Sequence, residues 1–364
     1  MNSKQRILAA LRNAQPDKVP IFEARIDESI MIDLGRILGA SNVPQPRTGE
    51  GVLYSETSPE ILDLHCFLVK ELGLDATSYQ FSTGLERIGD NRARDKYGRV
   101  YYLSEYGDPV VIEGPIKESS DIKGYDMVSK LKPDDFVRMQ YIIDNVGKDR
   151  AHIMCLNDPF KESWLLRGGM ENLLLDYKLN PGLVHGLARI ATDFTMAVVD
   201  VAARIGVDIL ILNGDLAGER TTFISPKDHR EYVKPYHREI VDYAHRKQLK
   251  IVKHTDGNAW LLLDDFVEVG FDGFHPVQPQ CMDIAEVKER LTGKACVLGN
   301  IDCRDLLPFG TEEEVEEAVR ETIGKVAPGG GYIICSSNSI HPGCKAENYM
   351  AMVKAAHKYG VGTP

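Results

Sequence analysis

The sequence lacks the paired cysteines that mark disulfide scaffolds and zinc ribbons. Its seven cysteines are odd in number and scattered along the chain, and none forms a CxxC pair. A disulfide framework is therefore not expected, and a reduced, cytoplasmic location is expected. Single cysteines remain available as metal ligands.

Long apolar runs and an excess of positive charge are also missing. No hydrophobic stretch approaches the length of a membrane span, and the opening MNSKQRILAALRN predicts a helix near Ser3 rather than a signal peptide. The formal net charge is −11. Nucleic acids and anionic membranes bind basic surfaces, so neither is expected as a partner.

Short apolar runs alternate with helix-length segments from about residue 150 onward. The predicted strands span residues 151–157, 207–213, 249–255, 271–276, 295–300 and 331–337, with an earlier candidate at 19–24. They are apolar at successive positions, as expected of strands covered on both faces. Repeated strand–helix units require a parallel sheet, and no GxGxxG follows a strand. We therefore predict an α/β fold of the (β/α)8 TIM-barrel type, formed by a single domain over residues 1–364 with an N-terminal helical segment.

Helix-start signals support this alternation. Asn or Ser followed by Pro is typical of a helix N-terminus, and Thr followed three residues later by Glu forms a capping box. The predicted starts are Asn180-Pro181, Ser225-Pro226, and Thr311 with Glu314.

Residues 75–118 differ from the strand–helix pattern. The stretch RARDKYGRVYYLSEYGDPVVIEG predicts a β-hairpin with its turn at Lys96-Tyr97-Gly98. We expect an insertion between early barrel units, or a lid over the barrel.

Polar residues able to bind ligands gather at the predicted strand ends. In a barrel of this type the carboxyl ends of the strands carry the active site. The residues at these positions are Asn157, Asp158, Asn213, Asp215, His254, Asp256, His275, Asn300, Asp302 and Cys335. Asn, Asp and Gly also form turns for backbone reasons alone, and a free cysteine is usually a core residue, so each of these positions also has a purely structural interpretation.

The stretch KHTDGN contains the strongest candidate ligands for a metal. It places His254 and Asp256 two residues apart where an apolar strand turns on Gly257. Imidazole, carboxylate and thiolate groups at one barrel end suit zinc, which takes three protein ligands and leaves a fourth position for substrate. We expect His254, Cys335 and Asp256 as ligands, with Asp215 as a further candidate. A solvated turn is the structural alternative.

Several longer segments resemble the uroporphyrinogen decarboxylase superfamily. They are DPFKESWLLRGGMENLLLDYKLNP (158–181), FISPKDHREYVKPYHREI (223–240), KHTDGN (253–258), VLGNID (297–302), HPGCKAENYMAMVKAA (341–356) and DKYGRVY (95–101). The resemblance implies one (β/α)8 barrel with its site at the C-terminal end. The superfamily contains metal-free decarboxylases and zinc-dependent methyltransferases that use corrinoid proteins and thiols.

The resemblance favours the methyltransferase branch. The decarboxylases carry an RQAGR motif, whereas this sequence reads IFEARIDES, which keeps Arg25 and adds Glu23 and Asp27. The thiol-directed methyltransferases bind zinc through a His-x-Cys pair and a later Cys. His254 matches the histidine and Asp256 replaces the first cysteine.

The expected function is therefore zinc-dependent transfer of a methyl group from a small methoxylated or methylated donor to a corrinoid (cobalamin) carried by a partner protein, as in O-demethylases. Asp215 and Asp256 are the expected catalytic residues. The expected substrate contacts are Arg25, Tyr97, Trp164, Asn157 and Asn300. A homodimer is possible, although no feature specifies one.

Two alternatives remain open at this point. One is a metal-free decarboxylase of uroporphyrinogen or of a smaller carboxylic acid, in which Asp215 handles the proton and Arg25 holds the carboxylate. The other is a non-catalytic barrel that serves as a binding subunit of a methyltransferase assembly. Bound metal separates the first alternative from methyl transfer.

Overall fold

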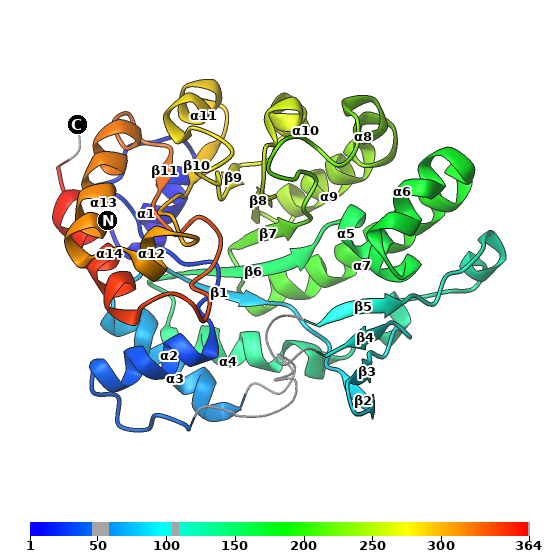
Figure 1. Cartoon of the computed structure of the whole chain (residues 1–364), viewed down its shortest axis with the longest axis horizontal. Helices are drawn as coiled ribbons and strands as arrows, with labels where there is room; N and C mark the ends of the chain where they lie inside the picture. Colours follow the sequence, from blue (N-terminus) through cyan, green and yellow to red (C-terminus); the bar gives the residue numbers. More distant parts are fainter. Residues whose placement is uncertain (46–57, 104–108, 363–364) are drawn as a thin grey trace.

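The main sheet has seven parallel strands and is curled (Figure 1). The computed structural model describes residues 1–45, 58–103 and 109–362. In spatial order the strands are β1 (Ala76–Gln80), β6 (Ala151–Asn157), β7 (Ile209–Asn213), β8 (Lys250–His254), β9 (Gly273–His275), β10 (Cys296–Leu298) and β11 (Tyr332–Ile333). The predicted parallel α/β architecture is confirmed.

The two edges of this sheet are bridged by the chain near Ile21. On one side Phe22 N donates to Ile334 O (3.2 Å) and Ile334 N donates to Pro20 O (3.0 Å). On the other side Asp75 N donates to Ile21 O (2.7 Å), directly before β1. The predicted early strand, residues 19–24, therefore lies between β11 and β1.

Alternation along each strand separates two apolar clusters. In β7, Ile209 and Ile211 pack inside the curled sheet with residues such as Cys335, whereas Leu210 and Leu212 pack outward in the larger cluster that includes the helices. Because both faces of the strands are covered, apolar residues occupy successive positions, which explains the unbroken apolar runs in the sequence.

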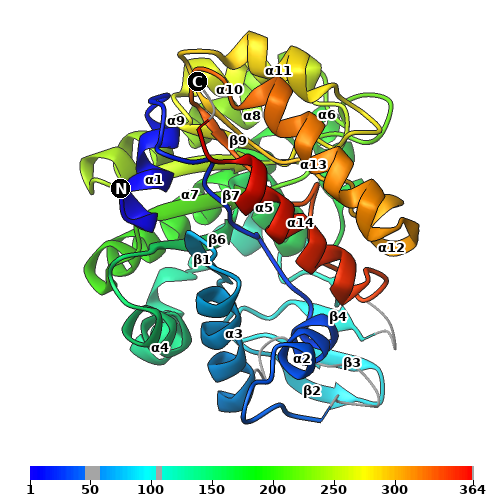
Figure 2. The ribbon, with the colours of Figure 1, turned by 90° about the vertical axis from the view of Figure 1, so that its left-hand side faces the viewer.

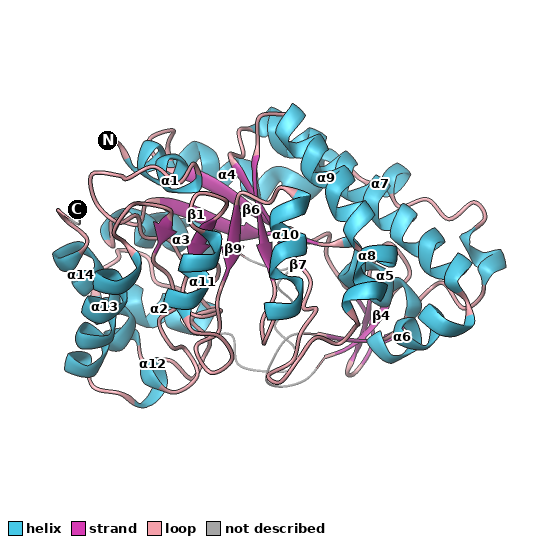
Figure 3. Ribbon diagram, turned by 90° about the horizontal axis from the view of Figure 1, so that it is seen from above, coloured by secondary structure: helices cyan, strands magenta, loops and turns pink. Residues whose placement is uncertain are grey.

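Helices flank the sheet, and most of them lie on its outer side (Figure 3), whereas the first helix packs through Ile7, Ala10 and Leu11 against the interior apolar cluster. They are α1 (Ser3–Leu11), α2 (Glu28–Ile37), α3 (Pro59–Glu71), α4 (Val137–Val146), α5 (Pro159–Arg167), α6 (Met170–Leu179), α7 (Pro181–Ile205), α8 (Pro226–Tyr232), α9 (Lys234–Arg246), α10 (Leu263–Val269), α11 (Ile284–Leu291), α12 (Leu306–Phe309), α13 (Glu312–Val326) and α14 (Ala346–Tyr359). Short 3-10 helices span Ser119–Ile122, Val128–Lys130, Pro133–Phe136 and Trp260–Leu262. Among the described helices, none has both the length and the apolar character to cross a bilayer.

The predicted helix starts are largely confirmed. The Thr311 side chain accepts from Glu314 N, and Thr311 N donates to Glu314 Oε2, so the capping box is present. The start predicted at Ser225 is confirmed, and the helical segment that begins there divides into α8 and α9 near Val233. Pro235 lies in the first turn of α9, where its missing N–H cannot continue the hydrogen bonding of α8.

The segment predicted as an insertion forms a separate antiparallel sheet on the side of the molecule that also carries α2 and α3 (Figure 2). Its strands, in spatial order, are β2 (Glu86–Gly89), β3 (Arg92–Arg94), β4 (Val100–Tyr102) and β5 (Val110–Glu113). The predicted turn joins β3 to β4, where Gly98 N donates to Asp95 O. The predicted boundary is wrong at its start, because β1 pairs with β6 in the main sheet. Residues 104–108 of the prediction lie outside the described residues.

Candidate metal centre and substrate cavity

Four neighbouring strands end at the same level of the sheet. The parallel register pairs Asn157 with Asn213, Asn213 with His254, and His254 with His275. These four residues are the last of β6, β7, β8 and β9. The register therefore gathers polar side chains into one layer at the carboxyl ends of the strands, as the sequence predicts.

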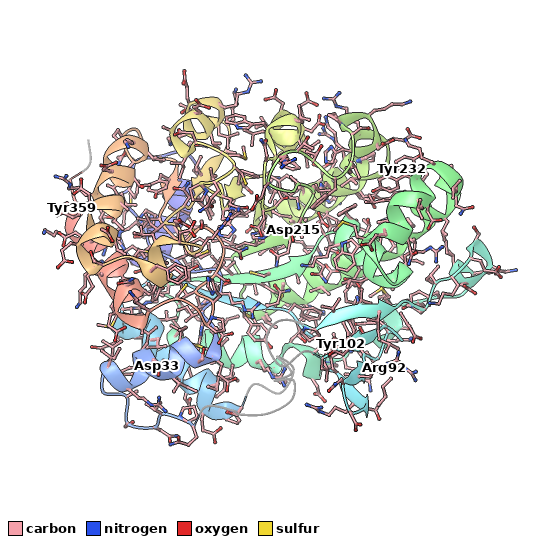
Figure 4. All side chains as sticks on the ribbon, viewed as in Figure 1. Asp33, Arg92, Tyr102, Asp215, Tyr232 and Tyr359 are labelled. Carbon is pink, nitrogen blue, oxygen red and sulfur yellow. The ribbon has the colours of Figure 1, made fainter. Side chains whose placement is uncertain are left out.

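Two carboxylates join His254 at this level. Asp215 follows β7 and lies near the middle of the molecule (Figure 4). His254 Nε2 is 3.6 Å from Asp215 Oδ1 and 3.8 Å from Asp256 Oδ1. One ligand atom of each of the three residues lies within 4.8 Å of those of the other two. All three side chains are partly exposed.

His275 fixes the orientation of the His254 ring. The two Nδ1 atoms are 2.7 Å apart, and His275 is fully buried. Burial, followed by the charge of His254, lowers the pKa of His275 far below its ordinary value, so this ring is neutral. A His254 ring that donates its Nδ1 hydrogen to His275 leaves Nε2 free as a lone-pair donor towards the carboxylates.

The electrostatics of this group suit a bound cation. Burial, followed by the nearby charge of Asp215, raises the pKa of Asp256 to about 7. Among the described residues, Asp256 Oδ1 is buried without a hydrogen-bond partner. Two adjacent carboxylates repel each other unless a proton or a metal lies between them.

The donor set fits zinc. His254, Asp215 and Asp256 would supply one imidazole nitrogen and two carboxylate oxygens, which leaves a position for substrate. Asn338 supports this arrangement, because its Nδ2 donates to Asp256 Oδ2 at 2.6 Å and leaves Oδ1 to face His254. Asn338 follows β11, and no pattern in the sequence singled it out.

The predicted Cys335 ligand requires correction. Cys335 is fully buried in the interior apolar cluster with Cys296 and Ile333, and it is not part of the group of potential ligands. It lies just beyond β11, three strands from β8 in the sheet. Strands of a curled sheet are staggered, so residues near two strand ends need not lie at the same level. Burial raises the pKa of the Cys335 thiol well above its ordinary value, which disfavours the thiolate form.

The loop that carries Asp256 has no room for a side chain at Gly257. The φ of Gly257 is +79°, and a Cβ there would lie 2.5 Å from Gly218 O. Leu216 N also donates to Thr255 Oγ1 at 2.9 Å, which ties this loop to the one after β7. The two carboxylates are therefore held by interlocked loops.

A buried lysine supports both loops from the outer face of the sheet. Lys253 Nζ donates to Asp158 Oδ2 (2.8 Å), Gly214 O (2.8 Å) and His254 O (2.7 Å). His237 Nε2 lies 2.9 Å from the same Asp158 oxygen. The sequence analysis included Asp158 among the polar strand ends but neither Lys253 nor His237, although a lysine inside an apolar strand was an available signal. The ammonium fixes the peptides next to Asp215 and at His254.

A cavity of about 880 Å³ opens onto the three candidate ligands. The predicted substrate contacts Arg25, Tyr97, Trp164 and Asn157 all line it. Asn300 is not among the lining residues, and its Nδ2 instead donates to Val277 O at 2.8 Å. The predicted substrate contact of Asn300 is therefore corrected to a structural role. Asn300, which follows β10, holds the loop after β9 through this hydrogen bond.

The antiparallel sheet contributes Tyr101, Val110 and Val111 to the wall of this cavity. Arg99, next to the β3–β4 turn, pairs with Asp95 and with Glu162 of α5, and all three side chains are buried. Asn157 Nδ2 donates to the other Glu162 oxygen at 3.0 Å. These bonds connect the antiparallel sheet to the end of β6, and whether the segment acts as a lid stays a prediction.

Known proteins resemble this chain over different lengths. Methylated-thiol–coenzyme M methyltransferase of Methanosarcina mazei is 29% identical over 187 residues, which are 51% of this chain and 48% of that protein. The match therefore spans about half of each. Methylcobamide:CoM methyltransferase MtbA of Methanosarcina acetivorans is 24% identical over 69% of this chain and 72% of its own length. Uroporphyrinogen decarboxylase of Methylobacillus flagellatus is 24% identical over 72% and 75%.

Solved structures and the family comparison agree on the fold. A methyltransferase from Methanosarcina mazei superposes with a TM-score of 0.76 at 20% sequence identity, and the superposition covers 99% of both chains. The uroporphyrinogen decarboxylase (URO-D) family matches residues 2–359, almost the whole sequence. The chain therefore belongs to the uroporphyrinogen decarboxylase (URO-D) family.

Proposed function

We propose that this protein is a zinc-dependent methyltransferase that moves a methyl group from a small methoxylated or methylated donor to a corrinoid carried by a partner protein. The observation that carries the proposal is the convergence of His254 Nε2 with one oxygen each of Asp215 and Asp256. This group faces a cavity large enough for a small organic donor.

The names of two relatives support methyl transfer as the reaction class. One is a methylated-thiol–coenzyme M methyltransferase and the other a methylcobamide:CoM methyltransferase. The donor set of this chain is richer in oxygen than the family pattern of one histidine and two cysteines. Harder oxygen ligands suit an oxygen-bound methyl group better than a thiol. We therefore propose a methyl ether as the donor, as in O-demethylation.

Each residue of the centre has a role in this proposal. Zinc bound there would act as a Lewis acid on the heteroatom that carries the methyl group. His254, Asp215 and Asp256 would hold the ion, and Asn338 orients the Asp256 carboxylate. In the cavity wall, Arg25, Tyr97, Trp164 and Asn157 would orient the donor, so that the methyl carbon faces the incoming corrinoid.

Elemental analysis of the purified, untagged protein and of a His254→Ala variant tests the centre. We expect near-stoichiometric zinc in the first and little in the second. Methyl transfer from methoxylated aromatic compounds to free cob(I)alamin, followed by absorbance, then tests the reaction. A protein that remains metal-free after incubation with zinc would contradict the proposal.

Decarboxylation of a small carboxylic acid is the second candidate, because Arg25 lines the same cavity as Asp215 and decarboxylases are among the relatives. Release of carbon dioxide without bound metal would favour it. The homodimer and the cytoplasmic location stay predictions.

A further inference from the structure

Lys161 lies beside the candidate metal centre. It is in the first turn of α5, where its backbone N donates to the N-cap residue Asp158 (2.8 Å), directly after the end of β6. Its side chain is partly buried and lines the same cavity as Asp215, His254 and Asp256. The parallel register of β6, β7 and β8 brings these positions to one end of the sheet.

No described residue holds the Lys161 ammonium in an ion pair or a hydrogen bond. In the described parts of the chain, its Nζ has no hydrogen bond and no carboxylate within 4.0 Å. By contrast, the buried cations Lys253 and Arg99 are both held in ion pairs. Although burial has the larger influence on the candidate ligands, the positive charge of Lys161 also acts to lower the pKa of each of them.

The net charge at this end of the cavity would change sign on metal binding. A divalent ion held there would neutralise the carboxylates of Asp215 and Asp256, while the imidazole of His254 is neutral. Lys161 then leaves one net positive charge next to the substrate position, in a partly buried site where electrostatic interactions are stronger than in water. Such a site favours a group that becomes negative during the reaction.

We propose that Lys161 is a catalytic residue that stabilises and protonates the oxygen from which the methyl group departs, and that the donor is a methyl ether of a phenol. This inference rests on the proposed function. The aromatic side chains of Trp164, Tyr97, Phe81 and Tyr101 line the cavity and suit an aromatic ring.

Atoms and electrons balance in this step. The bond between the methyl carbon and the donor oxygen breaks, and its electron pair stays on the oxygen. The new bond to the methyl carbon uses the electron pair of the reduced Co(I) corrinoid of the partner protein. Lys161 Nζ gives a proton to the oxygen and regains one from water, so a neutral phenol leaves.

Binding of the probe 4-nitrophenol, whose phenolate absorbs visible light, tests this assignment without turnover. With the zinc-loaded protein we expect the phenolate to bind, so that the apparent pKa of the bound phenol lies below that of free 4-nitrophenol. Because Lys161→Met removes a charged hydrogen bond, we expect the variant to bind the phenolate roughly 10- to 100-fold more weakly. Lys161→Arg should restore part of the affinity.

The control is Lys178→Met, which removes an exposed lysine outside the cavity and should leave binding unchanged. Zinc content and circular dichroism are measured on every variant. Unchanged affinity and unchanged phenol ionisation in a folded, zinc-loaded Lys161→Met protein would overturn the role of Lys161 while leaving the proposed function intact. A wild-type protein that holds no zinc after incubation with the metal would overturn the proposed function, and with it the positive charge on which the role of Lys161 depends.

Discussion

Lys253 Nζ and Asp158 Oδ2 are 2.8 Å apart, and neither side chain has any exposed surface. Lys253 comes from β8 and Asp158 from the junction of β6 and α5. The same ammonium holds the carbonyls of Gly214 and His254, so one buried ion pair joins the backbone of two strands that carry candidate metal ligands. Contacts made by Lys253 on the outer face of the sheet therefore help to fix the geometry of the candidate metal centre.

Replacing this lysine tests its structural contribution. Lys253→Met leaves the Asp158 carboxylate buried without its ammonium partner, with hydrogen bonds only from His237 and the Lys161 backbone N–H among the described residues. We therefore expect the free energy of unfolding to fall by about 3–5 kcal/mol. Zinc affinity should fall as well, because the carbonyl groups of Gly214 and His254, next to the candidate ligands, lose their hydrogen bonds to Lys253. Urea unfolding and zinc titration measure the two effects. Lys325→Met, at an exposed ion pair, should change stability by less than about 1 kcal/mol.

Substitutions around the centre separate its ligands from its neighbours. Asn338→Ala removes the hydrogen bond to Asp256, and we expect zinc affinity to fall about 10- to 100-fold while the fold is kept. Cys335→Ala should leave zinc affinity unchanged, because Cys335 lies in the apolar interior. Competition with a chromophoric chelator measures both variants. Loss of zinc in the cysteine variant, with the fold intact, would restore Cys335 as a ligand.

Gly257 offers a test of the loop that presents Asp256. Ala at this position combines an unfavourable positive φ with a contact of 2.5 Å to Gly218 O. Gly124 has a similar φ of +82°, but a Cβ added there would meet no heavy atom within 4 Å, so Gly124→Ala carries the backbone cost alone. We expect Gly257→Ala to cost roughly 1–3 kcal/mol more than the control, and zinc affinity to fall only in the first variant. Equal losses of stability for Gly257→Ala and Gly124→Ala in thermal unfolding would show that the loop adjusts to the added Cβ without further cost.

Glu23 predicts a pH dependence of stability. Its buried carboxyl accepts from Ser336 Oγ (2.7 Å) and N (3.1 Å), and burial raises its pKa to about 8 from an ordinary value of 4.5. Between these values the native state keeps a proton that the unfolded state releases. The free energy of unfolding therefore falls as the pH rises through this window.

The amide variant Glu23→Gln isolates this contribution. Since one pKa unit corresponds to about 1.4 kcal/mol, the wild type should lose roughly 4 kcal/mol more than the variant between about pH 5 and about pH 9. Urea unfolding at several pH values gives both curves. Parallel curves would mean that Glu23 ionises normally in the folded protein.

The sequence by itself determined the parallel α/β organisation and the positions of the strand ends. Strands covered on both faces must be apolar throughout, so their ends are visible where the apolar runs stop. The pair His254 and Asp256 could be recognised for the same reason, because both residues stand at the end of a single strand. Local signals also gave the Thr311 capping box, since cap and partner lie three residues apart.

Only the tertiary structure decided which strand ends meet. Asn338 and Asp256 share a hydrogen bond although they are 82 positions apart in the sequence, and Lys161 lines the same cavity from a different strand–helix unit. Cys335 was excluded because the stagger of the strands places it within the apolar interior. Contacts between distant segments depend on the curvature and register of the whole sheet, and no local pattern of residue types encodes these two quantities.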